Sequence, residues 1–277
     1  MRMTWVKRIS FAAAAAALLS LVPDAARAQS AETMLPAESE ARARRLLDES
    51  IAALGGQAYL GVRDIYRKGR LAQFGNNGEL NGYVKFEDYV KLPDKNRTEY
   101  ADKKNLMDIF NGNQGWSLDR GGVTEMPADA LERFQESLKK DVDILLRSRL
   151  HEEGLRLRYA GPDVVDLKAV EWVEVTDRER RITRIAVETA TRLPLQAVYQ
   201  HRHPETRQRT EEVELFSNYH DIQGVQTPLQ TARERNGRRI YQAFFETYQY
   251  NASLPDFLFS RESLDQRWAQ LDKKKKK

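Results

Sequence analysis

Turn signals recur at short intervals along most of the chain, and the segments between them alternate apolar and polar side chains. Asn76-Asn77-Gly78, Asn111-Gly112 and Asn236-Gly237 are such signals, because these residues tolerate the positive φ of a tight hairpin turn. Parallel strands would need a long crossover, usually helical, between each pair. The pattern therefore predicts an antiparallel sheet rather than βαβ units.

The last of these signals marks a hairpin near the end of the chain. Residues 229–235 and 238–250 are its expected strands, and the second is rich in β-branched and aromatic side chains. About ten or eleven strands are expected in all, and a twisted sheet of that size tends to curl or close. We therefore predict one large curved antiparallel sheet.

Three stretches have helical periodicity. Residues 38–54 end at Gly55-Gly56, since glycine readily adopts the left-handed conformation that ends a helix. Residues 128–150 follow Pro127, and residues 261–272 form a candidate last helix. The fold class is therefore α+β, with an N-terminal helix and a central helix that interrupts the strands.

The first 28 residues have the parts of a secretory signal peptide. Arg2, Lys7 and Arg8 precede an apolar run from Ile9 to Val22, and Ala26-Arg27-Ala28 fits the small-residue cleavage rule. The run is shorter than the roughly 20 residues of a membrane-spanning helix. We expect export and cleavage after Ala28, and the absence of cysteine from the chain suits a periplasmic protein without disulfides.

The remaining chain is expected to hold one domain. A flexible leader over 29–37 would precede a single domain over 38–272, and a lysine tail over 273–277 would follow it. The formal net charge of +4 falls to +1 without the signal peptide, and the body without the tail is negative, which argues against nucleic acid as a partner. The tail is either a solvated end or a weak contact with anionic lipid headgroups.

No catalytic motif, phosphate-binding loop or cofactor motif occurs in the sequence, so an enzyme and a bound cofactor are not expected. His201 and His203 have the strand spacing of a metal pair, but Pro204 follows at once and no third ligand has suitable spacing. A solvated turn is the simpler interpretation, and no metal site is predicted.

The central helix and the curved sheet leave two interpretations open. The helix either covers an apolar concavity or packs with the sheet into a solid core. In the first case it is a lid, whose apolar stripe comprises Leu131, Phe134, Leu138, Val142 and Leu145. The candidate residues of the concave face are Val84, Phe86, Val90 and Trp116.

Several segments resemble the LolA/LolB-type proteins that sort outer-membrane lipoproteins. They are Phe216-Ser217-Asn218-Tyr219, Gly224-Val225, Thr227-Pro228, Asn251, Leu254-Pro255-Asp256, Leu258-Phe259, Ala53-Leu54-Gly55-Gly56, Asn111-Gly112 and Gly115-Trp116. The resemblance implies an incomplete β-barrel under a helical lid that carries acyl chains of lipoproteins or lipids across the periplasm. Its partners would include an inner-membrane export complex and an outer-membrane acceptor.

Two departures from that family leave the cargo and the role open. The chain is longer than the typical carrier, with a long central helix, and it lacks the lipid-attachment cysteine of the receptor branch. A soluble carrier is expected. The alternative is an envelope sensor or scaffold of the same fold that binds a lipidated or protein ligand without transporting it.

Overall fold

The computed structural model describes residues 34–75, 77–100, 106–202 and 209–275. The predicted signal peptide, most of the predicted leader and His203 lie outside these residues. Within them, no helix combines the length and the apolar character that crossing a membrane requires.

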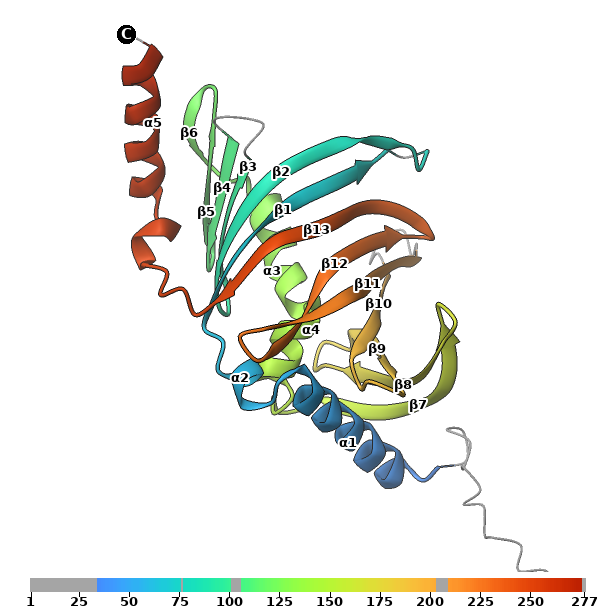
Figure 1. The fold of residues 1–277 in the computed structure, drawn as a ribbon. Coiled ribbons are helices and arrows are strands. Elements are labelled where there is room, and N and C mark those ends of the chain that lie inside the picture. The colour runs from blue at the N-terminus through green and yellow to red at the C-terminus, as the bar shows by residue number, and fades with distance from the viewer. Residues whose placement is uncertain (1–33, 76, 101–105, 203–208, 276–277) are drawn as a thin grey trace, which may run out of the picture.

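One antiparallel sheet contains all thirteen strands of the described residues, as predicted. They are β1 (Asp64–Phe74), β2 (Leu80–Lys91), β3 (Lys95–Tyr100), β4 (Leu106–Asn111), β5 (Gln114–Asp119), β6 (Gly122–Glu125), β7 (Arg156–Val165), β8 (Lys168–Thr176), β9 (Ile182–Glu188), β10 (Pro194–Arg202), β11 (Arg209–Ile222), β12 (Val225–Arg235) and β13 (Arg238–Tyr250). Two meanders, β1–β6 and β7–β13, join where β1 pairs with β13. The sheet arches without closing, and β6 and β7 form its two edges (Figure 1).

The predicted count of ten or eleven strands was too low. The four-residue strand β6 is too short for alternation to show it in the sequence. Gly161-Pro162-Asp163 has the composition of a turn but lies inside β7, which continues past an irregularity between Tyr159 and Gly161. The chain turns instead at Asp166 and Leu167, which both have positive φ.

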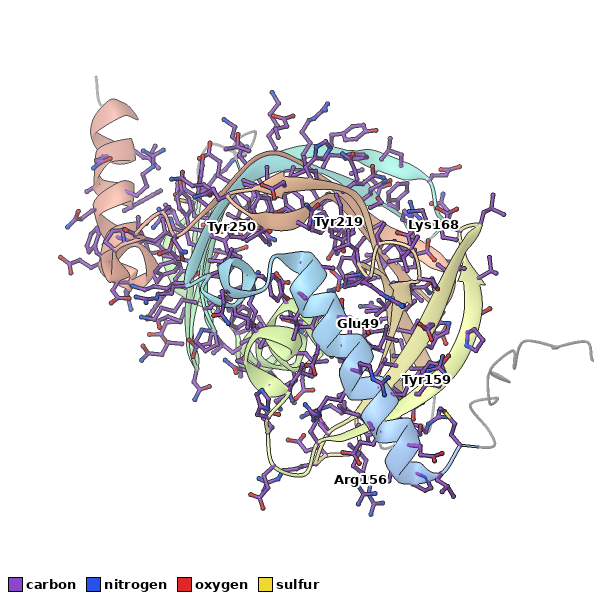
Figure 2. The ribbon with its side chains drawn as sticks, turned by 60° about the horizontal axis from the view of Figure 1, so that its bottom comes forward. Glu49, Arg156, Tyr159, Lys168, Tyr219 and Tyr250 are labelled. Atoms are coloured by element: carbon purple, nitrogen blue, oxygen red, sulfur yellow. The ribbon has the colours of Figure 1, made fainter. Side chains whose placement is uncertain are left out.

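The helices lie on both sides of the sheet. They are α1 (Pro36–Leu54), α2 (Gln57–Leu60), α3 (Ala128–Lys140), α4 (Val142–Ile144), the π-helical turn η1 (Leu145–Arg149), the 3₁₀ turn η2 (Asp256–Phe259) and α5 (Arg261–Lys275). The sheet arches over the segment from α3 to η1, and α1 crosses the open side (Figure 2). Helix α5 packs on the outer face against β5 and β6 (Figure 1).

Two helices extend into segments that were predicted as the leader and the lysine tail. α1 begins at Pro36, inside the predicted leader, because proline suits the first turn of a helix. α5 continues to Lys275, so the first three residues of the predicted lysine tail are helical.

The single central helix predicted over 128–150 was wrong, because the segment breaks at Asp141. Asp141 has extended backbone angles, and its Oδ1 accepts a hydrogen bond of 2.9 Å from the Ile144 amide. An aspartate that caps the next helix competes with continuation of the preceding one. The break separates α3 from α4 and η1.

An ion-pair network fastens α1 to the sheet. Glu171 on β8 accepts hydrogen bonds from Arg42 at 2.6 Å, Arg192 at 2.9 Å and the Tyr159 hydroxyl at 3.0 Å. The Arg42 guanidinium lies 3.8 Å from the centre of the Tyr159 ring, and Arg192 also pairs with Glu49. Tyr159 and Glu49 mark this contact in Figure 2, where α1 lies along β7.

Two large apolar clusters lie on opposite faces of the sheet. The main core, on the concave side, packs α1 and the segment α4–η1 against β7–β10, with Leu47, Leu145 and Ile185 among its buried residues. The second cluster lies under η2 and α5 and includes Phe259 and Leu264, both fully buried. The second cluster therefore uses the face turned away from the central segment.

Candidate functional site

A cavity of about 350 Å³ lies between the concave face of the sheet and the segment α4–η1. Strands β1, β2, β3 and β10–β13 supply its sheet side, and Tyr59 of α2 also lines it. The volume is at the lower end of the roughly 300–1,000 Å³ that is typical of small-molecule sites. Its wall is mixed, with an apolar part and a polar part, rather than wholly apolar.

The apolar part of the wall lies where β1, β2 and β13 run side by side. Phe86 and Phe245 meet edge to face with ring centroids 5.9 Å apart, and both are opposite Gly69 in the strand register. Leu71 lies opposite Ala243, two residues further along β1. These side chains form a separate buried cluster on the concave face.

Arg67 lies on the same face of β1, two residues before Gly69. Its Nε and Nη2 lie 3.1 and 3.0 Å from Oδ2 of Asp88, and its guanidinium is 5.0 Å from the centre of the Phe245 ring. Burial acts to lower the pKa of Arg67, but Tyr248 and Asp88 outweigh it, so the net shift of the pKa is upward. The guanidinium therefore keeps its charge inside the cavity.

Arg233 repeats this arrangement on β12. Its Nη2 donates to Oε2 of Glu214 at 3.4 Å, and its guanidinium lies 5.6 Å from the centre of the Tyr241 ring. Burial acts to lower the pKa of Arg233, and the nearby Glu214 carboxylate more than compensates and raises it. Two arginine–carboxylate pairs thus face the cavity from the sheet.

The third arginine, Arg147, comes from η1 on the opposite wall. Its guanidinium stacks 3.7 Å from the centre of the Tyr59 ring, and Nη1 donates to the Tyr59 carbonyl oxygen. Its side chain is only 5% exposed. Nη2 lies 3.6 Å from Oδ2 of Asp143, whose Oδ1 accepts a hydrogen bond of 2.8 Å from the Tyr59 hydroxyl.

Asp141, at the break in the central segment, is held where ionisation is unfavourable. Burial and the nearby carboxylates of Asp143 and Glu214 raise the pKa of Asp141 to about 6. Burial raises the pKa of Tyr59 as well, and the Asp143 carboxylate adds to that shift.

The structure divides the predicted lid residues between two environments. Leu131, Phe134 and Leu138 are on α3, which has no buried side chain, and they do not line the cavity. Val142 lines the cavity and is buried. Leu145 is buried in the main core instead.

The predicted concave-face residues are also divided. Phe86 lines the cavity, and Val84 lies opposite Leu71 on the same face. Val90 is on this face too, opposite Ile65, and packs against the main core. Trp116 lies on the other face, in the cluster under α5.

Sequence reasoning missed the charged part of the cavity. Arg67 occupies an inward position between Ile65 and Leu71, and a charge on the apolar face of an alternating strand is a usable signal. Arg147 directly follows Leu145-Leu146, within the stretch that was predicted to be one amphipathic helix. Its role depends on Tyr59, far away in the sequence.

No protein-family model and no curated protein sequence matches this chain. Several solved structures match its fold. A DUF1329 family protein from Desulfovibrio piger is 16% identical, with a TM-score of 0.58 over 80% of this chain and 98% of that one. A LolA superfamily protein from Nitrosomonas europaea matches with a TM-score of 0.51 at 12% identity, over 80% of this chain and 99% of that one. The fold is of the LolA type.

A third structural neighbour bears a functional name. A domain from Vibrio parahaemolyticus, described as a putative outer membrane lipoprotein-sorting protein, has a TM-score of 0.54 at 11% identity, over 82% of this chain and 99% of that one. At sequence identities this low, the likeness shows a shared fold and nothing about function. It agrees with the incomplete barrel that the sequence resemblance implied.

Proposed function

We propose that this protein binds the acyl chain of a lipid or lipoprotein in the cavity and carries it through the periplasm towards the outer membrane. The observation that supports the proposal is the cavity, whose apolar wall at Phe86, Phe245 and Leu71 lies opposite the central segment. The predicted signal peptide and the LolA-type fold support the location. An export complex of the inner membrane and an acceptor at the outer membrane would load and unload the carrier.

Helix α3 is the part of the lid that we expect to move. Phe134 stacks on Phe110 of β4 with ring centroids 4.4 Å apart, and the Gln135 side chain donates to the Gly112 carbonyl oxygen. None of the side chains of α3 is buried. Because Leu145 and Leu146 are buried in the main core, α4 and η1 should stay in place when α3 lifts.

Burying an acyl chain is worth more free energy than the contacts that hold α3 on the sheet. Removing an acyl chain of about 15 methylenes from water gains on the order of 12 kcal/mol at about 0.8 kcal/mol each. Leu131, Phe134 and Leu138 are half-buried, so each contributes less than the roughly 1.5–3 kcal/mol of a fully buried side chain. A bound acyl chain can therefore displace α3 with a net gain.

Phe134→Asp tests the role of α3. The variant places a charge on the face of α3 that contacts Phe110, which is the face that would cover a bound acyl chain. We therefore expect it to lose binding of a fluorescent fatty acid while its urea midpoint changes little, because Phe134 lies outside the buried core. Ser137→Asp is the matched control, since it adds the same charge to an exposed position of the same helix. Unchanged binding by Phe134→Asp would remove α3 from the mechanism.

Delivery separates a carrier from a sensor of the same fold. The protein, loaded with the fluorescent fatty acid, is mixed with acceptor liposomes, and transfer is followed by energy transfer to a membrane dye. A carrier delivers its cargo at a rate that depends on the liposome concentration. Binding without delivery would support the sensor alternative instead.

A further inference from the structure

We propose that the cargo is an anionic amphiphile and that Arg147 binds its negatively charged head group. This inference depends on the proposed acyl-chain site and names the chemical class of its ligand. It starts from a polar group that the protein itself leaves without a partner.

Arg147 presents an unused edge of its guanidinium. Nε and Nη2 are shielded from water, and neither has a hydrogen-bond acceptor among the described residues. These two nitrogens form the edge that binds both oxygens of a carboxylate or two oxygens of a phosphate. The third nitrogen, Nη1, is already used by the Tyr59 carbonyl oxygen.

Asp143 does not satisfy that edge. Its Oδ2 is 3.6 Å from Nη2, which is too long for a hydrogen bond, and the Tyr59 hydroxyl holds its other oxygen. Burying a charged donor without an acceptor is costly, so such groups are rare in native structures. An oxygen from a ligand would remove that cost.

Arg147 differs in this respect from the other arginines of the cavity wall. Arg67 and Arg233 each have a carboxylate within hydrogen-bonding distance, in Asp88 and Glu214. The cavity wall therefore has unpaired hydrogen-bond donors on Arg147. An anionic ligand would supply both the acceptor and the opposite charge.

The position of Arg147 suits a ligand with a charged end and an apolar end. Arg147 lines the cavity together with Tyr248 and Tyr250, which lie at the C-terminal end of β13. From there β13 passes Arg67, which lies opposite Tyr248, and reaches Phe245 and Ala243 in the apolar part of the wall. Tyr250 and Tyr219 lie under the arch of the sheet at this end (Figure 2). The head group would lie beside Tyr59, and the tail would extend towards Phe86.

The local backbone supports a functional role. Arg147 is in η1, a single π-helical turn, and such turns occur frequently at functional sites. Here it is followed by Ser148, whose hydroxyl bonds back to the Ile144 carbonyl oxygen. The turn is buried through Leu145 and Leu146, so it holds Arg147 on a rigid support.

The test compares ligands that share one tail and differ in the head group. Dodecanoate, dodecyl phosphate and dodecanol each compete with the uncharged fluorescent probe N-phenylnaphthylamine for the full-length protein. We expect the two anions to bind roughly 10- to 100-fold more tightly than the alcohol, the range that corresponds to a charge-assisted hydrogen bond. Preference for the carboxylate would indicate a free fatty acid as the source, and preference for the phosphate a phospholipid.

Arg147→Met should remove that preference. It keeps most of the side-chain volume, and we expect it to weaken both anions by the same factor and leave dodecanol unchanged. Arg158→Met is the control, because Arg158 is 56% exposed and pairs with Glu174 on the sheet. Equal loss for the alcohol and the anions would overturn the head-group role.

The outcomes separate this inference from the proposed function. Wild-type protein that binds dodecanol as tightly as dodecanoate would overturn the inference and leave the acyl-chain site standing. Failure of the probe and all three ligands to bind would overturn both. If Arg147→Met does not fold, the head-group comparison on the wild-type protein decides alone.

Discussion

Replacing Asp141 with asparagine should stabilise the protein at neutral pH and have no effect in mild acid. The carboxylate caps Ile144 at the break in the central segment, and asparagine caps a helix about as well as aspartate does. The substitution therefore keeps the hydrogen bond and removes only the charge. That charge is unfavourable beside Asp143 and Glu214.

The magnitude follows from the shifted pKa of Asp141. Its pKa rises from 3.8 to about 6 in the folded protein, and each unit is worth about 1.36 kcal/mol. The full shift therefore corresponds to about 3 kcal/mol. Because Asp141 is partly exposed, solvent screening reduces the effect, and we expect Asp141→Asn to add about 1–2 kcal/mol to the free energy of unfolding at neutral pH.

The sign of the pH dependence is opposite to that of a carboxylate in an ion pair. The folded protein binds the proton of Asp141 more tightly than the unfolded chain does, so this proton stabilises the fold below about pH 4. The stabilisation is lost as the pH rises through about 6. The variant should therefore match the wild type near pH 4 and exceed it near about pH 7.5.

Urea unfolding at these two pH values measures the difference. Asp129→Asn is the control on the same segment: Arg133 lowers the pKa of Asp129, so this variant should not be stabilised at neutral pH. Stabilisation by Asp141→Asn that is equal at both pH values, or destabilisation at neutral pH, would refute the reasoning.

Two further predictions concern packing, and both are measured by urea unfolding. Gly69→Ala places a Cβ against the Phe244 carbonyl oxygen and should lower the free energy of unfolding by more than about 2 kcal/mol. The control Gly237→Ala meets nothing within 4 Å and should lower it by only about 1 kcal/mol. Equal losses would contradict the close approach of β1 and β13. Leu264→Ala should lower the free energy of unfolding by about 3 kcal/mol, because Leu264 of α5 is fully buried against the sheet. Truncation of the half-buried Leu271 on the same helix should lower it less. A negligible loss at Leu264 would mean that α5 does not pack on the sheet.

The strands were predictable because their signals are local. Alternation in Leu80–Lys91 and the positive φ at Asn236 and Gly237 are properties of neighbouring residues, and the structure confirms the antiparallel sheet that they indicated. The broken central helix was not predictable from its stripe, because capping at Asp141 competes with a helical pattern that continues on both sides. β6 was missed because four residues are too few to show a period.

The side to which a residue turns was harder to predict than its element. Trp116 and Phe86 are both aromatic residues on strands, yet α5 covers one and the cavity borders the other. Alternation determines which residues share a face, and it leaves open which face the helices cover. Only the packing of α5 outside and α4 inside decided that.

The amino-acid sequence alone determined the antiparallel sheet, its curvature and the amphipathic helices, because periodicity and turn chemistry act over a few residues. The tertiary structure decided where the cavity lies and that its wall carries charge. Arg67, Arg147 and Arg233 are far apart along the chain. Arg67 and Arg233 are each held by an aromatic ring and a carboxylate from neighbouring strands, and Arg147 stacks on Tyr59 of α2. A site made of such long-range contacts leaves no local pattern in the sequence, because the distances between its charges exist only after the sheet has curled around the central segment.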